Sequence, residues 1–587
     1  MDYKSAAKNF LENEKQFQLG MIPTEQPNPI TKGLSSVLLK DTKAGVKMIL
    51  DADRDIPRAV NDAAKTQEFK NLVKDIKKAI DNRKTILLSS VGASGRMAVQ
   101  IDNGWRAFWT AVTQKLPRLK EKFIEISNLT ISMITGGDRA IVRSVENYED
   151  YMSFGRQQVI DANVGKGDLV IGLAECGLSA SINGSVLEAD DRGCTTYYVY
   201  YNPKEILCKY LDRVRVVFER ENIQKIYLFA GNMAIAGSTR MQAATVQLLA
   251  VGAALEIAGW QWLKENLSET ELSILGDGAF TIEEYTAEYT RMLDQLSSEP
   301  AVSGIAKYIE YEAETYKKGG LITYATHDYQ LDIMTDTTER QPTFTIPPFR
   351  RKSDKTSQVS WAFIKDPLYP TEVAWQHLLR REPKGLEWTV EDYKRLGASQ
   401  AIINNPPQVG TEYVRDYEIG NEDDPSRYSQ PNSKLVCVDI HGSACGKTMA
   451  WYNENVKKFS GGVVLRIGEI PNKKLADNEI LIPVKVSHTI TELMSHTMIK
   501  VLFNLISTAS MTKLGRVWSN WMIQVLPTNK KLIDRSTRII ATIANIPYEQ
   551  ALEEFFKSYL GREEGQVYKE SYVVESLRRL GFEPEVK

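Results

Sequence analysis

One stretch of the chain restricts its fold more than any other. Between Ile86 and Asp102, an apolar run is followed by a turn rich in glycine and serine and then by a helical pattern. The apolar run predicts a buried strand, and the residues after the turn recur at the spacing of a helix. The sequence therefore predicts a strand, a tight turn and the start of a helix, which is the first unit of an α/β domain.

The turn itself holds Gly92, Ser94 and Gly95. Glycine lets backbone N–H groups approach an anion, and the Ser94 hydroxyl adds a further donor. A helix N-terminus also carries roughly half a positive charge. The turn is therefore a candidate phosphate site. A capped strand-to-helix connection without a ligand explains the same residues, and the turn by itself does not separate the two interpretations.

Strands and helices alternate through the first half of the chain. Apolar runs predict further strands at Phe123–Ile134, Asp168–Ala174, Thr195–Tyr201 and Lys225–Ala230. Alternation of this kind predicts a doubly wound sheet of mostly parallel strands, with the ligand loops at the carboxyl ends of the strands. Three loops that carry serine and glycine are expected to meet there: Ser90–Arg96, Glu175–Ser181 and Gly231–Met241. A turn is predicted at Gly136–Arg139, followed by a helix that holds Val145–Asp150.

The same pattern begins again after a helical stretch near residues 280–318. Strands are predicted from Leu321, at Gln400–Asn404, at Lys434–Ile440 and at Ile480–Val486. This arrangement indicates an internal duplication. Polar insertions at 347–390 and 410–433 separate the strands, and the second predicts a surface loop. From Met511 the apolar residues recur at helical spacing and predict a helical cap.

The chain of 587 residues exceeds the ~250–300 residues at which a single core stops growing. We therefore expect an N-terminal segment (1–55), two doubly wound α/β domains (56–270 and 271–510) and a C-terminal helical lid (511–587).

Composition excludes several classes of protein. The chain is 43% hydrophobic and 25% charged, as soluble globular proteins are, and its net charge of -2 excludes a basic surface for nucleic acid. The start lacks the apolar core of a signal peptide, and Gln247 and Glu256 interrupt the most apolar helix, so we expect no membrane partner and a cytoplasmic location. Five cysteines without a CxxC pair and five histidines without ligand spacing predict neither disulfides, nor a metal, nor a cofactor.

The segment His441–Thr448 follows a predicted strand and is similar to a nucleotide-binding loop. It has one residue too few between its glycines for the GxxxxGK[ST] spacing. The duplication predicts instead that this loop is the counterpart, in the second domain, of the loop that holds Ser179.

Several motifs taken together resemble one family. They are Thr24–Thr31, Gly92–Arg96, Gly136-Gly137 with Val145–Asp150, Gly237–Arg240, and the tail motifs Leu514–Val517 and Thr528–Leu532. Their order resembles that of the family that joins the N-acetylmuramic acid 6-phosphate etherases to the glucokinase regulatory proteins, built from sugar isomerase (SIS) domains. Two SIS domains followed by a helical lid is the arrangement of the regulatory proteins. An etherase subunit has one SIS domain and pairs with a second copy.

The resemblance implies a pair of carboxylates. In the etherases one carboxylate removes the proton at C2, lactate leaves C3 and water adds back, which requires one ionised and one protonated group. Glu149 matches one of these glutamates. The position of the other in the first domain is Gly104, whereas the second domain has Glu339 in the matching motif Asp336–Phe344. We therefore expect one composite site that uses Glu149 and Glu339.

The resemblance also implies binding residues. Gly92, Ser94, Gly95, Ser179 and Ser181 would bind phosphate, Ser238 and Arg240 would line the sugar pocket, and Arg516 would reach in from the lid. The chain departs from the etherase pattern at Cys176, Leu178 and Met233.

Two functions remain open, with aldose–ketose isomerisation as a third. One is a regulator that binds a hexose, N-acetylhexosamine or muramic acid 6-phosphate and acts on a sugar kinase; the other is an active etherase. Gly104 and the altered phosphate loop favour the regulator.

Overall fold

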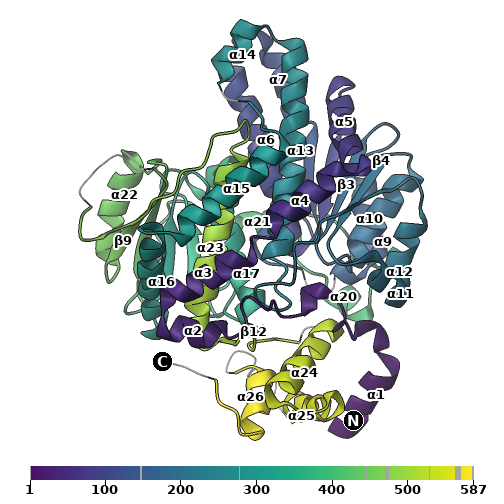
Figure 1. Cartoon of the computed structure of the whole chain (residues 1–587), viewed down its shortest axis with the longest axis vertical. Coiled ribbons are helices and arrows are strands. Elements are labelled where there is room, and N and C mark those ends of the chain that lie inside the picture. Colours follow the sequence, from purple (N-terminus) through teal and green to yellow (C-terminus); the bar gives the residue numbers. More distant parts are fainter. Residues whose placement is uncertain are drawn as a thin grey trace.

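The computed structural model describes residues 2–145, 148–276, 278–444, 446–469, 475–527, 529–561 and 570–584. Its centre consists of two five-stranded parallel sheets. Figure 1 shows the first sheet, with β3 and β4, on one side of the molecule and the second, with β9, on the other, with α23 between them. The fold class predicted from the sequence, α/β with two doubly wound parallel sheets, is confirmed.

The first sheet has the order β2-β1-β3-β4-β5, and every neighbouring pair is parallel. Its strands are β1 (Ile86–Ser90), β2 (Thr130–Ile134), β3 (Leu169–Ala174), β4 (Thr195–Tyr200) and β5 (Gln224–Tyr227). Every residue of β1 and β3 is buried, which explains why these strands are continuous apolar runs. The helices of this half are α5 (Gln67–Asp81), α6 (Gly92–Lys115), α7 (Lys120–Ser127), α8 (Arg139–Val142), α9 (Met152–Asp161), α10 (Ala180–Asp191), α11 (Lys204–Tyr210), α12 (Asp212–Glu219), α13 (Gln242–Asn266) and α14 (Glu269–Leu275).

The second sheet repeats the first, with the order β10-β9-β8-β6-β7. Read from its other edge, β7, β6, β8, β9 and β10 take the places of β2, β1, β3, β4 and β5, so the predicted duplication is confirmed. These strands are β6 (Ile322–Ala325), β7 (Ala362–Lys365), β8 (Lys434–Ile440), β9 (Gly462–Ile467) and β10 (Glu479–Ile482). The loop after β8 is therefore the counterpart of the Ser179 loop after β3, as expected. Helices α15 (Ile282–Ser297), α16 (Ala301–Lys317), α17 (Gln330–Phe344), α18 (Thr371–Leu379), α19 (Val390–Arg395), α20 (Gln400–Asn404), α21 (Thr411–Arg415), α22 (Lys447–Asn455) and α23 (Leu493–Lys513) belong to this half.

Four central helices join the two sheets. Helix α13 packs on α6 and α23, and α17 packs on α6 and α23, so one apolar core continues through both halves. Helix α13 is the one described helix long and apolar enough to cross a membrane, and 89% of its apolar window is buried inside the protein. Its Glu256 is fully buried and accepts hydrogen bonds from Thr489 Oγ1 (2.8 Å) and the Thr491 N–H (2.7 Å). Glu256, which interrupts the apolar pattern of this helix, is therefore satisfied within the core.

Some predicted elements are wrong. Phe123–Ile134 is not one strand, because α7 occupies its first part; Phe123 and Ile126 are buried three residues apart while Ile124 is exposed, which is a helical pattern. The predicted strand Gln400–Asn404 is the helix α20. The expected insertion at 347–390 contains β7 and α18, and the sequence did not predict β9.

Two further segments, Val145–Asp150 and the insertion at 410–433, differ from what the sequence predicted. Of the helix predicted over Val145–Asp150, the structure describes a short 3-10 helix at Tyr148–Asp150, while 146 and 147 lie outside the described residues. Within 410–433, Arg427 is 2% exposed and donates to the backbone carbonyls of Ser360 and Ile322, at 2.6 and 2.8 Å. Because buried backbone carbonyls need hydrogen-bond donors, this arginine attaches the segment to the edge of the second sheet.

The first helix of the chain lies beside its last helices (Figure 1). The N-terminal segment forms α1 (Tyr3–Asn13), α2 (Leu34–Lys40), α3 (Thr42–Ala52) and α4 (Ile56–Lys65), and the C-terminal part forms the hairpin of β11 (Val517–Trp518) and β12 (Trp521–Met522) and then α24 (Lys530–Ala544), α25 (Tyr548–Gly561) and α26 (Tyr572–Arg579). Helix α1 packs against α25, and Phe10 meets Phe556 edge to face. This helical tail covers the carboxyl end of the first sheet, where the loops converge.

Candidate functional site

A cavity of about 230 Å³ lies where the loops after β1, β2 and β3 meet. In a sheet of order 2-1-3-4-5 the strand order reverses between β1 and β3, and ligands of such sheets bind at that point. The second domain contributes the end of α17 to the cavity wall, and the tail contributes the start of α24. The cavity is therefore formed by three parts of the chain that lie far apart in sequence.

The turn after β1 forms one wall. Gly92 has a φ of +58°, a conformation that side chains disfavour, and nothing lies near the place of a Cβ. A Cβ on Gly95 would lie 2.5 Å from Ile134 Cδ1, so this glycine lets α6 pack closely on β2. The Ser94 hydroxyl donates to the carbonyls of Val91 (2.8 Å) and Leu173 (3.1 Å). Gly92 and Ser94 line the cavity, and Gly95 supports the turn from behind.

A row of hydroxyl groups runs from the loop after β3 into the protein. Ser179 lines the cavity, and its Oγ lies 3.1 Å from Ser181 Oγ. Ser181 Oγ lies 3.0 Å from Thr135 Oγ1 and is fully buried, beneath the lining residues. The structure thus brings Ser179 to the cavity surface and leaves Ser181 behind it, where it orients Ser179.

Glu149 reaches the cavity from the loop after β2 and meets the tail there. Its Oε1 lies 3.6 Å from the Nζ of Lys531 on α24. The negative charge of Glu149 raises the pKa of Lys531, while burial acts to lower it. Lys531 therefore brings a positive charge to the cavity. Lys531 belongs to the tail motif Thr528–Leu532, but the motif alone does not assign this lysine a role in binding.

Glu339 enters the same cavity from α17 of the second domain. Its carboxylate pairs with the guanidinium of Arg96 on α6, which is 1% exposed. Arg96 Nε also donates to the Ile141 carbonyl at 2.7 Å. The structure therefore brings Glu149 and Glu339 to one cavity, and the arginine that follows Gly95 holds the second of them in place.

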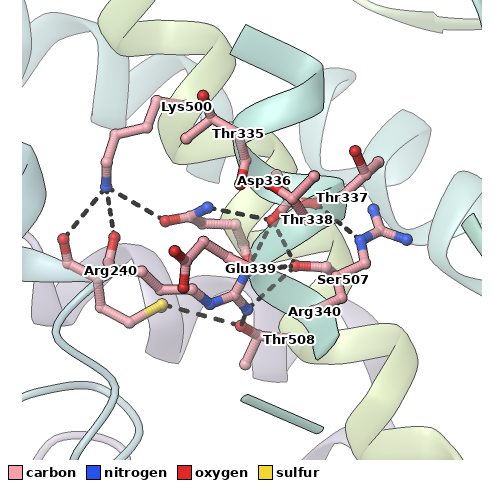
Figure 2. A network of polar contacts seen from close by, with 12 residues as sticks. Arg240, Thr335, Asp336, Thr337, Thr338, Glu339, Arg340, Lys500, Ser507 and Thr508 are labelled. Carbon is pink, nitrogen blue, oxygen red and sulfur yellow. Dashed lines mark hydrogen bonds and ion pairs between the residues drawn. The ribbon is translucent and has the colours of Figure 1, made fainter. Parts of the chain in front are cut away.

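Ser238 and Arg240 precede α13 and line the cavity beside Glu339. Arg240 Nη1 lies 2.8 Å from Asp336 Oδ1, and its guanidinium also donates to Ser507 and Thr508 on α23 at 3.1 and 3.0 Å. Figure 2 shows Arg240 held between α17 and α23 by these contacts. Ser238 Oγ and Arg240 Nε, however, are buried without a hydrogen-bond partner among the described residues. Both atoms remain available to a ligand.

Lys500 holds the backbone of this wall by hydrogen bonds. Its Nζ donates to the carbonyls of Arg240 (2.7 Å) and Met241 (3.2 Å), as Figure 2 shows. Burial lowers the pKa of Lys500 to about 8, and nearby Asp53 opposes that change. Lys500 therefore fixes the backbone that carries Arg240.

Arg516 does not line the cavity. Its guanidinium donates to the Phe344 carbonyl at 2.6 Å and lies 4.6 Å from the Trp361 ring centroid. Phe344 is the last residue of α17, so Arg516 satisfies a carbonyl at the helix C-terminus, where a cation is favoured. The expectation that this side chain reaches into the cavity does not match its position; Arg516 acts on the helix that carries Glu339.

The structure also brings in Glu175, which the sequence analysis did not select. Glu175 lines the cavity and is 7% exposed, and its Oε1 has no hydrogen-bond partner among the described residues. Burial raises its pKa to about 7; a hydrogen bond from Thr239 acts against the rise, and the charge of Glu339 adds to it. Since a carboxyl group titrating near pH 7 can give and take protons, Glu175 is a further candidate for acid–base chemistry.

The arrangement combines two kinds of chemistry. Donors for an anion are supplied by the start of α6, Ser179, Ser238, Arg240 and Lys531. Carboxylates are supplied by Glu149, Glu175 and Glu339.

The first half of the chain is similar to known proteins. Residues 68–189 match the family model of the glucokinase regulatory protein N-terminal SIS domain. The N-acetylmuramic acid 6-phosphate etherase of Petrotoga mobilis is 29% identical over 226 residues, which is 38% of this chain and 66% of that protein. The enzyme of the same name from Salmonella agona is 28% identical over 229 residues, 39% of this chain and 67% of that protein. The chain thus spans about two thirds of the length of these relatives.

Among solved structures, the tagatose-6-phosphate ketose/aldose isomerase of Escherichia coli has a TM-score of 0.41 and 11% identity, covering 79% of this chain and 93% of that one.

The parallel sheet and the matched residues 68–189 identify a SIS domain in the first half of the chain. These similarities support the resemblance of the chain to the family that joins the glucokinase regulatory proteins and the N-acetylmuramic acid 6-phosphate etherases.

Proposed function

We propose that this protein binds a hexose or N-acetylhexosamine 6-phosphate, muramic acid included, in a single composite site, and that it works as a regulator. Occupancy of the site would be passed to a protein partner, for which we propose a sugar kinase, in the cytoplasm. The proposal uses the division into two SIS domains (56–270 and 271–510) and a lid (511–587). One observation carries it: the cavity is closed by Glu339 of the second half and Lys531 of the tail together.

The phosphate group is assigned to the start of α6. Its backbone N–H groups at Gly92–Ser94 and the Ser179 hydroxyl are neutral donors, and a helix N-terminus favours an anion. Lys531 adds a positive charge, and Ser238 and Arg240 offer unpaired polar atoms to the sugar hydroxyl groups. A cavity of about 230 Å³ suits one small ligand, because the pockets that hold drug-sized ligands have volumes of roughly 300–1,000 Å³.

Because the tail and the second half both contribute to the wall, a ligand that fills the cavity binds the closed arrangement better than an open one. A ligand shifts an equilibrium only by its differential affinity for the two states, and here that difference comes from Lys531 and Glu339. The position of the tail would therefore report whether the sugar phosphate is bound, which is the property that a regulator needs.

The second candidate is an active etherase, favoured by the presence of Glu149 and Glu339 in one cavity. We expect a regulator to bind sugar phosphates without turnover. The test incubates the full chain with N-acetylmuramic acid 6-phosphate and follows D-lactate, beside the variants Glu149→Gln and Glu339→Gln. We expect no lactate from the wild type, and a rise in melting temperature with the ligand. A ligand at 100 times its Kd stabilises by about 2.7 kcal/mol.

Lactate that the wild type releases and both variants fail to release would establish the etherase and overturn the regulator. A wild type whose melting temperature does not respond to fructose 6-phosphate, glucose 6-phosphate, N-acetylglucosamine 6-phosphate or N-acetylmuramic acid 6-phosphate would contradict both functions. Inorganic phosphate serves as the reference ligand that lacks the sugar.

Replacing Lys531 with methionine is expected to weaken sugar-phosphate binding by about 10- to 100-fold. The reason is that a hydrogen bond to a charged group contributes roughly 1.5–3 kcal/mol. The loss also leaves Glu149 unpaired and repelling the phosphate. The adjacent variant Lys530→Met is the matched control, because Lys530 is exposed and pairs with Glu14 instead. Titration calorimetry of both variants measures the effect, and equal Kd values for the two would contradict the assigned position of the phosphate.

A further inference from the structure

The duplication produces a second cleft, which the proposed function does not use. It has a volume of about 640 Å³ and lies at the ends of β6 and β8, the counterparts of β1 and β3. Asn103 and Gly104 of α6 line it from the opposite domain, just as Glu339 of α17 lines the first cavity. The two clefts are therefore related by the internal symmetry, and α6 and α17 each contribute to both.

The residues of the second cleft differ in kind from those of the first. The chain has five histidines, and all of them line this cleft. They come from the loop after β6 (His327), from α18 (His377), from the loop after β8 (His441), from the approach to α23 (His488) and from α23 itself (His496). Gly104 stands where the first cavity has a carboxylate, so the acid–base pair has no counterpart here.

Two of these histidines meet a buried carboxylate. His327 Nδ1 lies 2.9 Å from Asp366 Oδ2, and His377 Nδ1 lies 4.0 Å from the same oxygen. One donor atom of each of the three residues lies within 4.8 Å of the others. Asp366 is fully buried, and His377 Nδ1 is a buried nitrogen with no hydrogen-bond partner among the described residues. Because buried polar atoms in proteins are nearly always partnered, this unpartnered nitrogen beside a carboxylate oxygen is consistent with a bound ion.

The backbone holds Asp366 in a position to ligate. Asp366 directly follows β7, and its Oδ1 accepts from the N–H groups of Leu368 (2.7 Å) and Tyr369 (3.2 Å). These bonds fix the carboxylate and leave Oδ2 toward the two imidazoles. Outer hydrogen bonds of this kind orient metal ligands in proteins.

We propose that His327, Asp366 and His377 bind a divalent transition-metal ion in the second cleft. Two imidazole nitrogens and one carboxylate oxygen are the donor set of many three-ligand zinc sites, which leave a further position open. Here the open position faces the cleft. The stacked rings, with centroids 4.1 Å apart, would turn about their side-chain bonds to direct both nitrogens at one ion.

The charges around the cluster are compatible with a cation. The Asp366 carboxylate lies 4.0 Å from His377 Nδ1 and brings a negative charge to the cluster. Arg380 also lines the cleft and opposes a cation there, whereas Asp328 and the charge of Asp366 attract one. One ion with two charges would replace the proton that His327 shares with Asp366.

The test titrates the metal-free full chain with Zn²⁺ by calorimetry and with Co²⁺ by visible spectroscopy. We expect one ion per chain, with the absorption of nitrogen- and oxygen-ligated cobalt. His327→Gln, His377→Gln and Asp366→Asn should each weaken binding by more than the roughly 10- to 100-fold that loss of an outer partner costs. The matched controls are His441→Gln and His488→Gln, on the other wall of the cleft, and they should change Kd by less than about twofold.

Three results would overturn the proposal. They are no binding by the wild type, an equal loss in the control variants, or cobalt absorption with sulfur charge-transfer bands, which would indicate the cysteines. Melting curves of every variant, recorded without metal, show whether each is folded. Asp366→Asn keeps the shape and the backbone hydrogen bonds of Asp366, so a folded variant is available if either histidine variant fails to fold.

Discussion

Replacing Arg96 with methionine is expected to destabilise the protein by about 3–5 kcal/mol, because the change breaks a buried ion pair and leaves the other charge without its partner. Arg96 is 1% exposed, and its guanidinium joins Glu339 of the second half to the Ile141 carbonyl of the first. Methionine keeps most of the volume of the side chain, so the loss reports the charge. Urea unfolding at pH 7 measures it.

The double variant Arg96→Met with Glu339→Gln separates the two possible causes. If the unpaired carboxylate causes the loss, removal of its charge should recover a large part of the stability. The exposed Arg143 provides the control: Arg143→Met should change the free energy of unfolding by less than about 0.5 kcal/mol. A single Arg96 variant as stable as this control would contradict the role of the ion pair in joining the two halves.

Replacing Glu25 with glutamine is expected to release the helical tail. Glu25 is 2% exposed and accepts from Arg535 Nε at 2.9 Å and from Arg538 Nη2 at 2.8 Å, both on α24. An amide leaves the buried Arg535 without its counter-charge and leaves Arg538 with Asp534 alone, which costs about 3–5 kcal/mol. Because Lys531 and Arg535 line the cavity, sugar-phosphate affinity should fall together with stability. Limited proteolysis of the tail measures the release.

The same pair predicts how stability depends on pH. Burial acts to raise the pKa of Glu25, but Arg535 and Arg538 outweigh it and lower the pKa from 4.5 to about 2. A carboxyl group with a lowered pKa in the folded state contributes its stability above the unfolded value. That contribution, roughly 3 kcal/mol, is lost as the pH falls from about 4.5 to about 2.

The Glu25→Gln variant should therefore lose less stability on acidification than the wild type does. The exposed Glu549 on α25 supplies the control, since Glu549→Gln should follow the wild-type curve. Parallel acid curves for the wild type and Glu25→Gln would show that the pair does not hold the tail.

Much of the fold follows from local pattern. The fully buried strands β1 and β3 are apolar runs, which the hydrophobic pattern of the sequence predicts as strands. Gly92 and Gly95 mark the turn between strand and helix. The duplication was also visible, because β6 and β8 repeat the pattern. Local pattern was insufficient at α7 and at β7, which are short and have charged neighbours. In such segments tertiary contacts override local preference.

The sequence by itself predicted the two doubly wound sheets, and its resemblance to a known family implied that Ser94, Ser179, Glu149, Glu339 and Arg240 belong to one candidate site. Only the tertiary structure decided which side chains reach the cavity: Lys531 and Glu175 do, and Arg516 acts on α17 instead. It also brought together five histidines from four separate segments of the chain. The physical reason is that backbone preferences act over a few neighbouring residues, whereas a site depends on contacts between segments that are distant in sequence and are adjacent only after the two halves and the tail have packed.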